Sequence, residues 1–179
     1  MTVNPWHDIK PGSLAPKRVN AVIEIAERSK AKYEIDKENG LLRLDRVLFS
    51  ELTYPANYGF IPQTYCDDGD PLDVIVICSQ ILEPRSITEV TVLGAIEMLD
   101  NGQGDDKVIA VVSNDPYLHN LKSLADVPKK NLDAIIFFFE NYKKKENKNI
   151  EIQGILQQDQ AYRLIEKSIQ DYINKFDRK

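Results

Sequence analysis

The stretch CDDGDPLDVIVIC, residues 66–78, joins an aspartate-rich turn directly to an apolar strand. Asp-Gly and Asp-Pro pairs are strong turn signals, and the run of Val and Ile that follows is typical of a buried strand. Four carboxylates lie within residues 67–73. Two like charges about 4 Å apart repel by roughly 4 kcal/mol at an effective dielectric constant of about 20, so this cluster needs a compensating partner.

The same alternation of turn and strand extends outward from this stretch. Short segments rich in β-branched residues, bounded by Gly, Pro and Asp, occupy much of residues 19–112. Their spacing is typical of an antiparallel meander or a barrel. The predicted strands are Val19–Ala26, Ala31–Asp36, Leu41–Leu48, Asp73–Ser79, Glu89–Met98 and Lys107–Val112.

Helical patterns dominate the last third of the chain. Asp126 and Pro128 open the run PKKNLDAIIFFFENYKKK, whose apolar residues recur at helical spacing. A second amphipathic run begins near Asp159, and NIEIQG, residues 149–154, predicts a short closing strand between the two helices. Strands followed by helices predict an α+β fold, in which a small closed or half-closed sheet has helices packed against it.

Composition predicts one domain and excludes several partners. The 179 residues are 42% hydrophobic, and no repeat or linker divides them, so we expect a single domain over residues 1–179. The net charge of -5 opposes general attraction to nucleic acid. The first twenty residues contain no apolar run, so we expect no signal peptide, no membrane partner and a cytoplasmic location. Cys66 and Cys78 form no CxxC pair, which indicates neither a zinc site nor a disulfide.

Charged residues interrupt the apolar pattern of the first three predicted strands. These residues are Glu24, Lys32, Glu34 and Arg46. Each one taken singly is best explained by a solvated strand face. Taken together, they come from three successive strands and could line one mouth of a barrel, which is where small ligands bind.

A second acidic turn, DNGQGDD at residues 100–106, lies between two apolar strands. The ordinary explanation is a polar hairpin loop, and GQG is not a phosphate-binding fingerprint because a strand follows it. With DDGDPLD, however, it supplies the oxygen ligands that hard cations such as magnesium, manganese or calcium prefer. An EF-hand is excluded, since the twelfth loop position is Ser79 and no helix flanks the loop.

Cationic and phenolic side chains accompany these acids, notably Lys107, Tyr142 and Lys143. In phosphoryl transfer, acids bind metals, the metals bind phosphate oxygens, and Lys, Arg and Tyr hold the remaining oxygens. The chain has neither a Walker motif nor a dinucleotide fingerprint. A small phosphorylated substrate attacked by water therefore fits the residues better than a nucleotide does.

Several segments, in the same order along the chain, resemble the soluble family I inorganic pyrophosphatases of the bacterial type. They are KYEIDKENG from Lys32, LDRVL from Leu44, YPANYGFIP from Tyr54, DGDPLD at residues 68–73, the D-x4-D-x-K spacing at residues 100–107, and FFFENYK ending at Lys143. The resemblance spans roughly residues 19–155. It implies an OB-like five-stranded β-barrel, hydrolysis of pyrophosphate to two orthophosphates by a metal-activated water, several Mg²⁺ ions with Mn²⁺ as a substitute, and a homo-oligomer that is a hexamer.

The resemblance also implies a role for each matching residue. Asp70 would deprotonate the attacking water, and Tyr58 would assist catalysis. The metal ligands would be Asp68, Asp73, Asp105, Asp100, Glu24 and Glu34. The phosphates would be held by Lys32, Arg46, Tyr58, Lys107, Tyr142 and Lys143. Asn101 stands where bacterial members commonly have a second acid, which predicts a weaker outer metal site.

Three other functions compete with this one. The same site could hydrolyse another phosphoric anhydride or a phosphate ester. An OB-type binding module could use the acidic loop to hold calcium structurally. Oligonucleotide binding is disfavoured by the net charge of -5 and by the lack of aromatic residues interleaved with basic ones.

Overall fold

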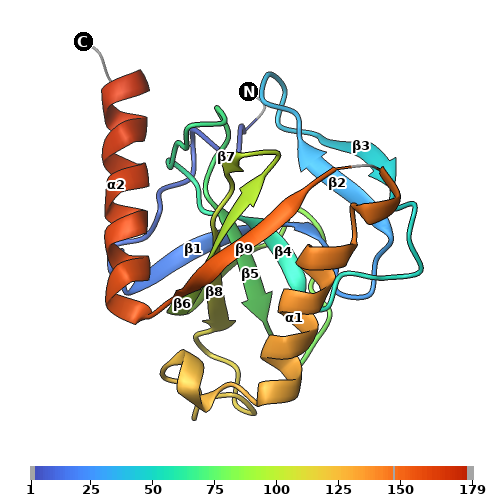
Figure 1. Cartoon of the computed structure of the whole chain (residues 1–179). Coiled ribbons are helices and arrows are strands. Elements are labelled where there is room, and N and C mark those ends of the chain that lie inside the picture. Colours follow the sequence, from blue (N-terminus) through green and yellow to red (C-terminus); the bar gives the residue numbers. More distant parts are fainter. Residues whose placement is uncertain (1–2, 147, 177–179) are drawn as a thin grey trace.

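Five strands close into a ring in the computed structural model, which describes residues 3–146 and 148–176 (Figure 1). Each strand pairs with the next, and the last pairs again with the first. All neighbours are antiparallel except β5 and β8, which are parallel. The ring confirms the predicted OB-like barrel. In order around it, the strands are β1 (Arg18–Ile25), β4 (Asn57–Phe60), β5 (Asp73–Ile77), β8 (Lys107–Val112) and β6 (Ile87–Asp100).

Four further strands of the described residues lie outside the ring. β2 (Ala31–Ile35) and β3 (Leu42–Val47) form a separate antiparallel hairpin. β7 (Gln103–Gly104) and β9 (Ile150–Leu156) both pair with the long strand β6. The strand expected at residues 149–154 therefore exists, but it extends the sheet beside β6 instead of closing the barrel.

Strand β4 has no counterpart among the predicted strands, because NYGF is short and contains a glycine. The glycine is required by close packing. An ideal Cβ built on Gly59 would lie 1.8 Å from the carbonyl oxygen of Val22 in the neighbouring strand β1. Gly59 thus permits β1 and β4 to approach each other, and it places Tyr58 beside β5 through the Cα pairing of Tyr58 with Ile75.

Two helices pack against the barrel from different sides (Figure 1). α1 (Lys129–Asn141) begins directly after Pro128, as predicted, and buries Ile135, Phe138 and Phe139. α2 (Gln158–Phe176) begins one residue before the expected start and stands at the opposite edge. Short 3-10 turns, η1 (Leu124–Asp126) and η2 (Lys144–Glu146), precede and follow α1. None of the helices in the described part of the chain has the length and apolar character needed to cross a bilayer.

The parallel pairing of β5 with β8 determines where the acidic turns lie. Asp73 and Lys107, the first residues of the two strands, are Cα partners. Because parallel strands begin at the same edge of a sheet, DGDPLD before β5 and DNGQGDD before β8 meet at one end of the barrel. Successive side chains of β5 point to opposite faces of the sheet. Val74 packs in the apolar cluster under α2 and Ile75 in the cluster under α1, so both clusters hold the start of β5 in place.

Candidate active site

A cavity of about 350 Å³ opens at the end of the barrel where β5 and β8 begin. It collects side chains from the N-terminal segment, from strands β1 and β4, from the β2–β3 hairpin, from the two acidic turns with the first residues of β5 and β8, and from the end of α1. Every predicted site residue except Arg46 lines it. Its ionisable lining consists of three tyrosines (Tyr33, Tyr58 and Tyr142), seven acids and four lysines. The acids and lysines are Glu24, Glu34, Asp68, Asp70, Asp73, Asp100, Asp105, Lys32, Lys37, Lys107 and Lys143.

Lys107 is the most deeply buried charge of the cavity, with 2% of its side chain exposed. Its Nζ donates hydrogen bonds of 2.6 Å to Asp73 Oδ2 and to Asp105 Oδ1. It also lies 5.7 Å from the centre of the Tyr58 ring. Burial alone would lower the pKa of Lys107, but the two carboxylates outweigh it and hold that pKa well above its usual range. Lys107 therefore stays protonated and joins the two acidic turns.

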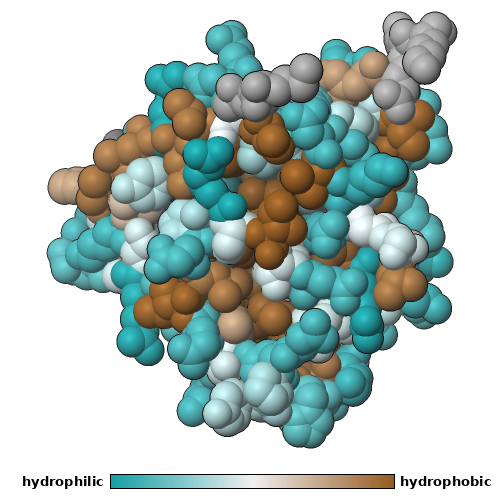
Figure 2. Space-filling view, turned by 180° about the vertical axis from the view of Figure 1, so that it is seen from behind, coloured by the Kyte–Doolittle hydropathy of each residue, from teal (hydrophilic) through white to brown (hydrophobic). Residues whose placement is uncertain are grey.

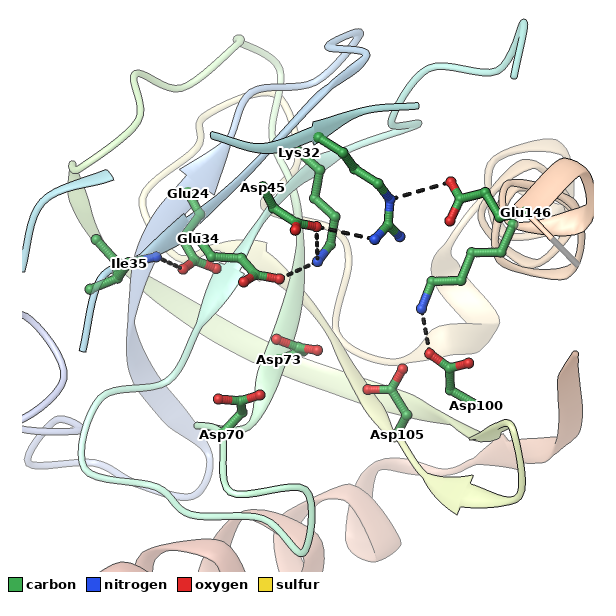
Figure 3. Close-up of polar contacts among 12 residues, drawn as sticks. Glu24, Lys32, Glu34, Ile35, Asp45, Asp70, Asp73, Asp100, Asp105 and Glu146 are labelled. Atoms are coloured by element: carbon green, nitrogen blue, oxygen red, sulfur yellow. Dashed lines mark hydrogen bonds and ion pairs between the residues drawn. The ribbon is translucent and has the colours of Figure 1, made fainter. Parts of the chain in front are cut away.

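The β2–β3 hairpin supplies a second cation. Lys32 Nζ donates to Glu34 and, at 3.3 Å, to Asp45 Oδ2. Burial opposes its charge, yet the hydrogen bond and the charge of Glu34 raise the pKa of Lys32 above its usual value. In Figure 3, Lys32 and Glu34 extend towards the side of the cavity where Asp73 lies.

Glu24 extends from β1 and is 7% exposed. One carboxylate oxygen accepts a 2.6 Å hydrogen bond from the Ile35 N–H (Figure 3). Burial, reinforced by the charges of Asp73 and Glu34, raises the pKa of Glu24 to about 8. The apolar run that Glu24 interrupts in the sequence is thus a buried strand, and the side chain is not on a solvated face.

Asp68 and Asp70 belong to the turn before β5. Gly69 has a φ of 86°, in the left-handed region that favours glycine, and the Asp70 N–H donates to Asp68 Oδ1 at 3.0 Å. Leu72 is buried and its N–H donates to Thr64 Oγ1 at 2.8 Å, which fixes the end of the turn. Burial raises the pKa of Asp68.

The end of α1 supplies Tyr142 and Lys143. Tyr142 is the C-terminal cap of the helix, and its ring stacks on Phe138 with the centroids 4.9 Å apart. Burial raises the pKa of Tyr142, so its hydroxyl remains a neutral donor. Lys143 Nζ donates to Asp100 Oδ2 of the second acidic turn. Both residues line the cavity.

Arg46 lies outside the cavity lining and is held in two ion pairs. Its Nη1 is 3.1 Å from Asp45 Oδ2, and its Nε is 3.3 Å from Glu146 Oε1. Nε and Nη2 are buried, and neither has a hydrogen-bond partner within the described chain. Nη2 thus retains donor capacity that an anion beside it could use, whereas Nε already faces the Glu146 carboxylate.

Sequence reasoning missed Lys37, Trp6, Asp45 and Glu146. Asp45 could have been found, because it adjoins Arg46 in LDRVL and pairs with Lys32 across the hairpin. The others come from segments whose proximity only the folded chain creates. Trp6 and Lys37 line the cavity, and Glu146 reaches Arg46 from the turn after α1.

The donor chemistry of the cavity suits hard divalent cations. All seven acids offer oxygen ligands, and they outnumber the four lysines, so a polyanion would be repelled unless further cations entered with it. Across residues 3–146 and 148–176, no three His, Cys, Asp or Glu side chains are gathered closely enough to form a ready-made metal cage. Lysine ammonium groups instead bind Asp73, Asp105 and Asp100.

Comparisons with known proteins agree on one family. A family model described as inorganic pyrophosphatase matches residues 21–173. The chain is 42% identical over 172 residues to the soluble inorganic pyrophosphatase of Oryza sativa subsp. japonica, covering 96% of this chain and 80% of that protein. It is 43% identical over 169 residues to soluble inorganic pyrophosphatase 2 of Chlamydomonas reinhardtii, covering 94% and 88%. The crystal structure of inorganic pyrophosphatase from Thermus thermophilus aligns with a TM-score of 0.90 at 38% identity, covering 95% of this chain and 99% of that one.

Proposed function

Since the chain belongs to the family of soluble inorganic pyrophosphatases, we propose that its hydrolysis of pyrophosphate takes place in the cavity at the start of β5 and β8. The overall reaction is the attack of water on one phosphorus atom and cleavage of the bridging P–O bond, which releases two orthophosphates. The observation that supports this location is the meeting of both acidic turns around Lys107.

We propose Mg²⁺ as the metal of this metal-dependent family, with several ions per site and Mn²⁺ as a substitute. The excess of acids over lysines in the cavity supports this proposal. When bound, such ions would supply Lewis acidity, which lowers the pKa of a coordinated water to about 7 and neutralises charge on phosphate oxygens. The residues that would hold them are Asp68, Asp73, Asp105, Asp100, Glu24 and Glu34.

The protein's own groups would divide the remaining work. Asp70 is the proposed general base: its side chain is 48% exposed and lines the cavity, so it can accept a proton from an entering water. Tyr58 would donate a hydrogen bond to the reacting phosphate, because burial holds its pKa well above the usual range and keeps the hydroxyl protonated. The other proposed phosphate-binding residues are Lys32, Arg46, Lys107, Tyr142 and Lys143.

Arg46 fits this role through its Nη2. A phosphate oxygen could accept from Nη2, which is buried without a hydrogen-bond partner in the described residues, whereas Nε already faces Glu146 Oε1 at 3.3 Å. A charge-assisted hydrogen bond of this kind is roughly twice as strong as one between neutral groups. The ion pairs with Asp45 and Glu146 would then hold the guanidinium while the phosphate binds.

Assembly, location and domain organisation belong to the same proposal. We propose a cytoplasmic homo-oligomer, a hexamer of one-domain subunits spanning residues 1–179. Exposed hydrophobic side chains support self-association: Phe49 is 69% exposed and Tyr117 is 76% exposed. Figure 2 shows hydrophobic residues gathered on the face opposite to that of Figure 1.

A phosphate-release assay tests the metal and the substrate together. The enzyme is supplied with pyrophosphate or ATP, in Mg²⁺, in Mn²⁺ or in excess EDTA. We expect rapid release from pyrophosphate in Mg²⁺, slower release in Mn²⁺, little from ATP and none in EDTA. Equal release from ATP would contradict the substrate, and undiminished release in EDTA would contradict the metal requirement.

A further inference from the structure

The Asp70 carboxylate depends on a single partner. The turn fixes its backbone, because the Asp70 N–H donates to Asp68 Oδ1 at 3.0 Å and the Asp70 carbonyl accepts from the Cys66 N–H at 2.8 Å. The side chain, by contrast, lies at the half-exposed rim of the cavity. Among the described residues, Lys37 Nζ is the one group that forms an ion pair or hydrogen bond with the Asp70 carboxylate.

Lys37 is in turn held by the N-terminal segment. It lies in the turn between β2 and β3, where its carbonyl oxygen accepts a 2.8 Å hydrogen bond from Asn4 Nδ2. Its ammonium lies 5.8 Å from the centre of the Trp6 ring. Trp6 is 4% exposed and is anchored by a 2.9 Å hydrogen bond from its Nε1 to the Thr64 carbonyl oxygen. Asn4 thus fixes the backbone of Lys37, and the buried Trp6 ring lies under its ammonium.

Stabilisation of the fold does not explain this arrangement. The Lys37 and Asp70 side chains are 53% and 48% exposed, and exposed ion pairs contribute little to the stability of a protein. Orientation of a reacting group, however, can matter greatly: a misplacement of about 1 Å can cost about 100-fold in rate. Lys37 and Trp6 both line the cavity beside Asp70, so their contacts can set the orientation of the Asp70 carboxylate within it.

We propose that Lys37 is a positioning residue for pyrophosphate hydrolysis, whose ammonium keeps the Asp70 carboxylate turned towards the cavity. The inference rests on the proposed role of Asp70 as the general base. In this proposal Lys37 acts through the Asp70 carboxylate with which it pairs, and not directly on the reacting water or the phosphorus. Removal of the Lys37 ammonium therefore affects the chemical step through Asp70. Binding of pyrophosphate still depends on the proposed phosphate-binding cations Lys32, Arg46, Lys107 and Lys143.

The test compares Lys37→Met with the matched control Lys30→Met. Lys30 lies in the loop just before β2, and its Nζ is 3.4 Å from Glu51 Oε2. It does not line the cavity. With pyrophosphate and saturating Mg²⁺, we expect Lys37→Met to lower kcat about tenfold while KM stays within about twofold. Lys37→Arg, which keeps the charge, should recover most of kcat, and Lys30→Met should match the wild type. The melting temperature of each variant should stay within about 2 °C.

Other outcomes would overturn the inference. An unchanged or increased kcat in Lys37→Met would show that the ammonium does not orient the base. A higher KM at unchanged kcat would make Lys37 a phosphate ligand. A loss of kcat that follows the melting temperature and is not rescued by Lys37→Arg would make the role structural. Asp70→Asn is assayed in parallel: if it stays active, the base assignment fails, whereas an inactive Asp70→Asn beside a fully active Lys37→Met refutes the Lys37 inference alone.

Discussion

Glu24 shows what burial does to a single carboxyl group in this protein. Its side chain is almost fully enclosed, and burial raises its pKa to about 8 from an ordinary value of 4.5. Without metal, the folded protein holds the Glu24 proton to a higher pH than the unfolded chain does. The stability that this proton provides is complete below pH 4.5 and is lost as the pH rises towards about 8.

Glu24→Gln should remove that pH dependence, because the amide is neutral at every pH. We expect the free energy of unfolding of the wild type, relative to the variant, to fall between pH 4.5 and about 8 and then to level off. The measurement is urea unfolding in EDTA across this range. Parallel pH profiles for the two proteins would show that Glu24 is ionised in the fold.

Residues whose role depends on their own strand could be anticipated from the sequence. Glu24 stood out because it interrupts an apolar run, and Asp68 and Asp73 because they crowd one turn. Lys37 and Trp6 gave no such signal. Lys37 stands within a continuous run of polar residues in a turn, and it comes to line the cavity only because the N-terminal segment and the acidic turn both fold against it.

At the scale of elements, one pairing builds the site. β5 and β8 are parallel and begin in register, so two turns that are about thirty residues apart in the sequence meet around Lys107. The sequence indicated both strands and both turns, because each has its own pattern of apolar and turn residues. It could not indicate their pairing, since no local pattern reports which distant strand lies alongside.

The helices and β4 show the two extremes of what local patterns reveal. Helical spacing and Pro128 placed the start of α1 correctly, because a long periodic run averages out individual exceptions. β4 has only four residues and a central glycine, which is a poor strand signal. The reason for Gly59 lies in the neighbouring strand, whose backbone leaves no space for a side chain.

Gly59→Ala should therefore destabilise the barrel. Its Cβ would meet the Val22 carbonyl oxygen at 1.8 Å, and relief of this overlap must separate β1 from β4. We expect a loss of about 1–3 kcal/mol in the free energy of unfolding, measured by thermal or urea denaturation. Gly154→Ala in β9 is the control, because its nearest neighbour is a Glu97 side-chain oxygen at 3.7 Å. Equal stability of the two variants would refute the close packing of β1 on β4.

At the scale of the whole molecule, charge is the governing feature. The chain carries a net charge of -5, and acids outnumber lysines in the cavity as well. Pyrophosphate is itself strongly anionic, so the site must recruit cations to admit it. Under the proposed assignment, the same acids that repel one another in the free chain would be the ligands for those cations, which would explain why the fold keeps them together.

The most direct test of this account is the turnover of Asp70→Asn compared with Asp67→Asn. Both changes remove one charge from the same acidic stretch, but Asp67 does not line the cavity. In saturating Mg²⁺, with phosphate release measured and folding checked by thermal denaturation, Asp70→Asn should lose at least about 100-fold in kcat. Asp67→Asn should remain close to the wild type. If a folded Asp70→Asn protein released phosphate at nearly the wild-type rate, the central claim that Asp70 activates the attacking water would be wrong.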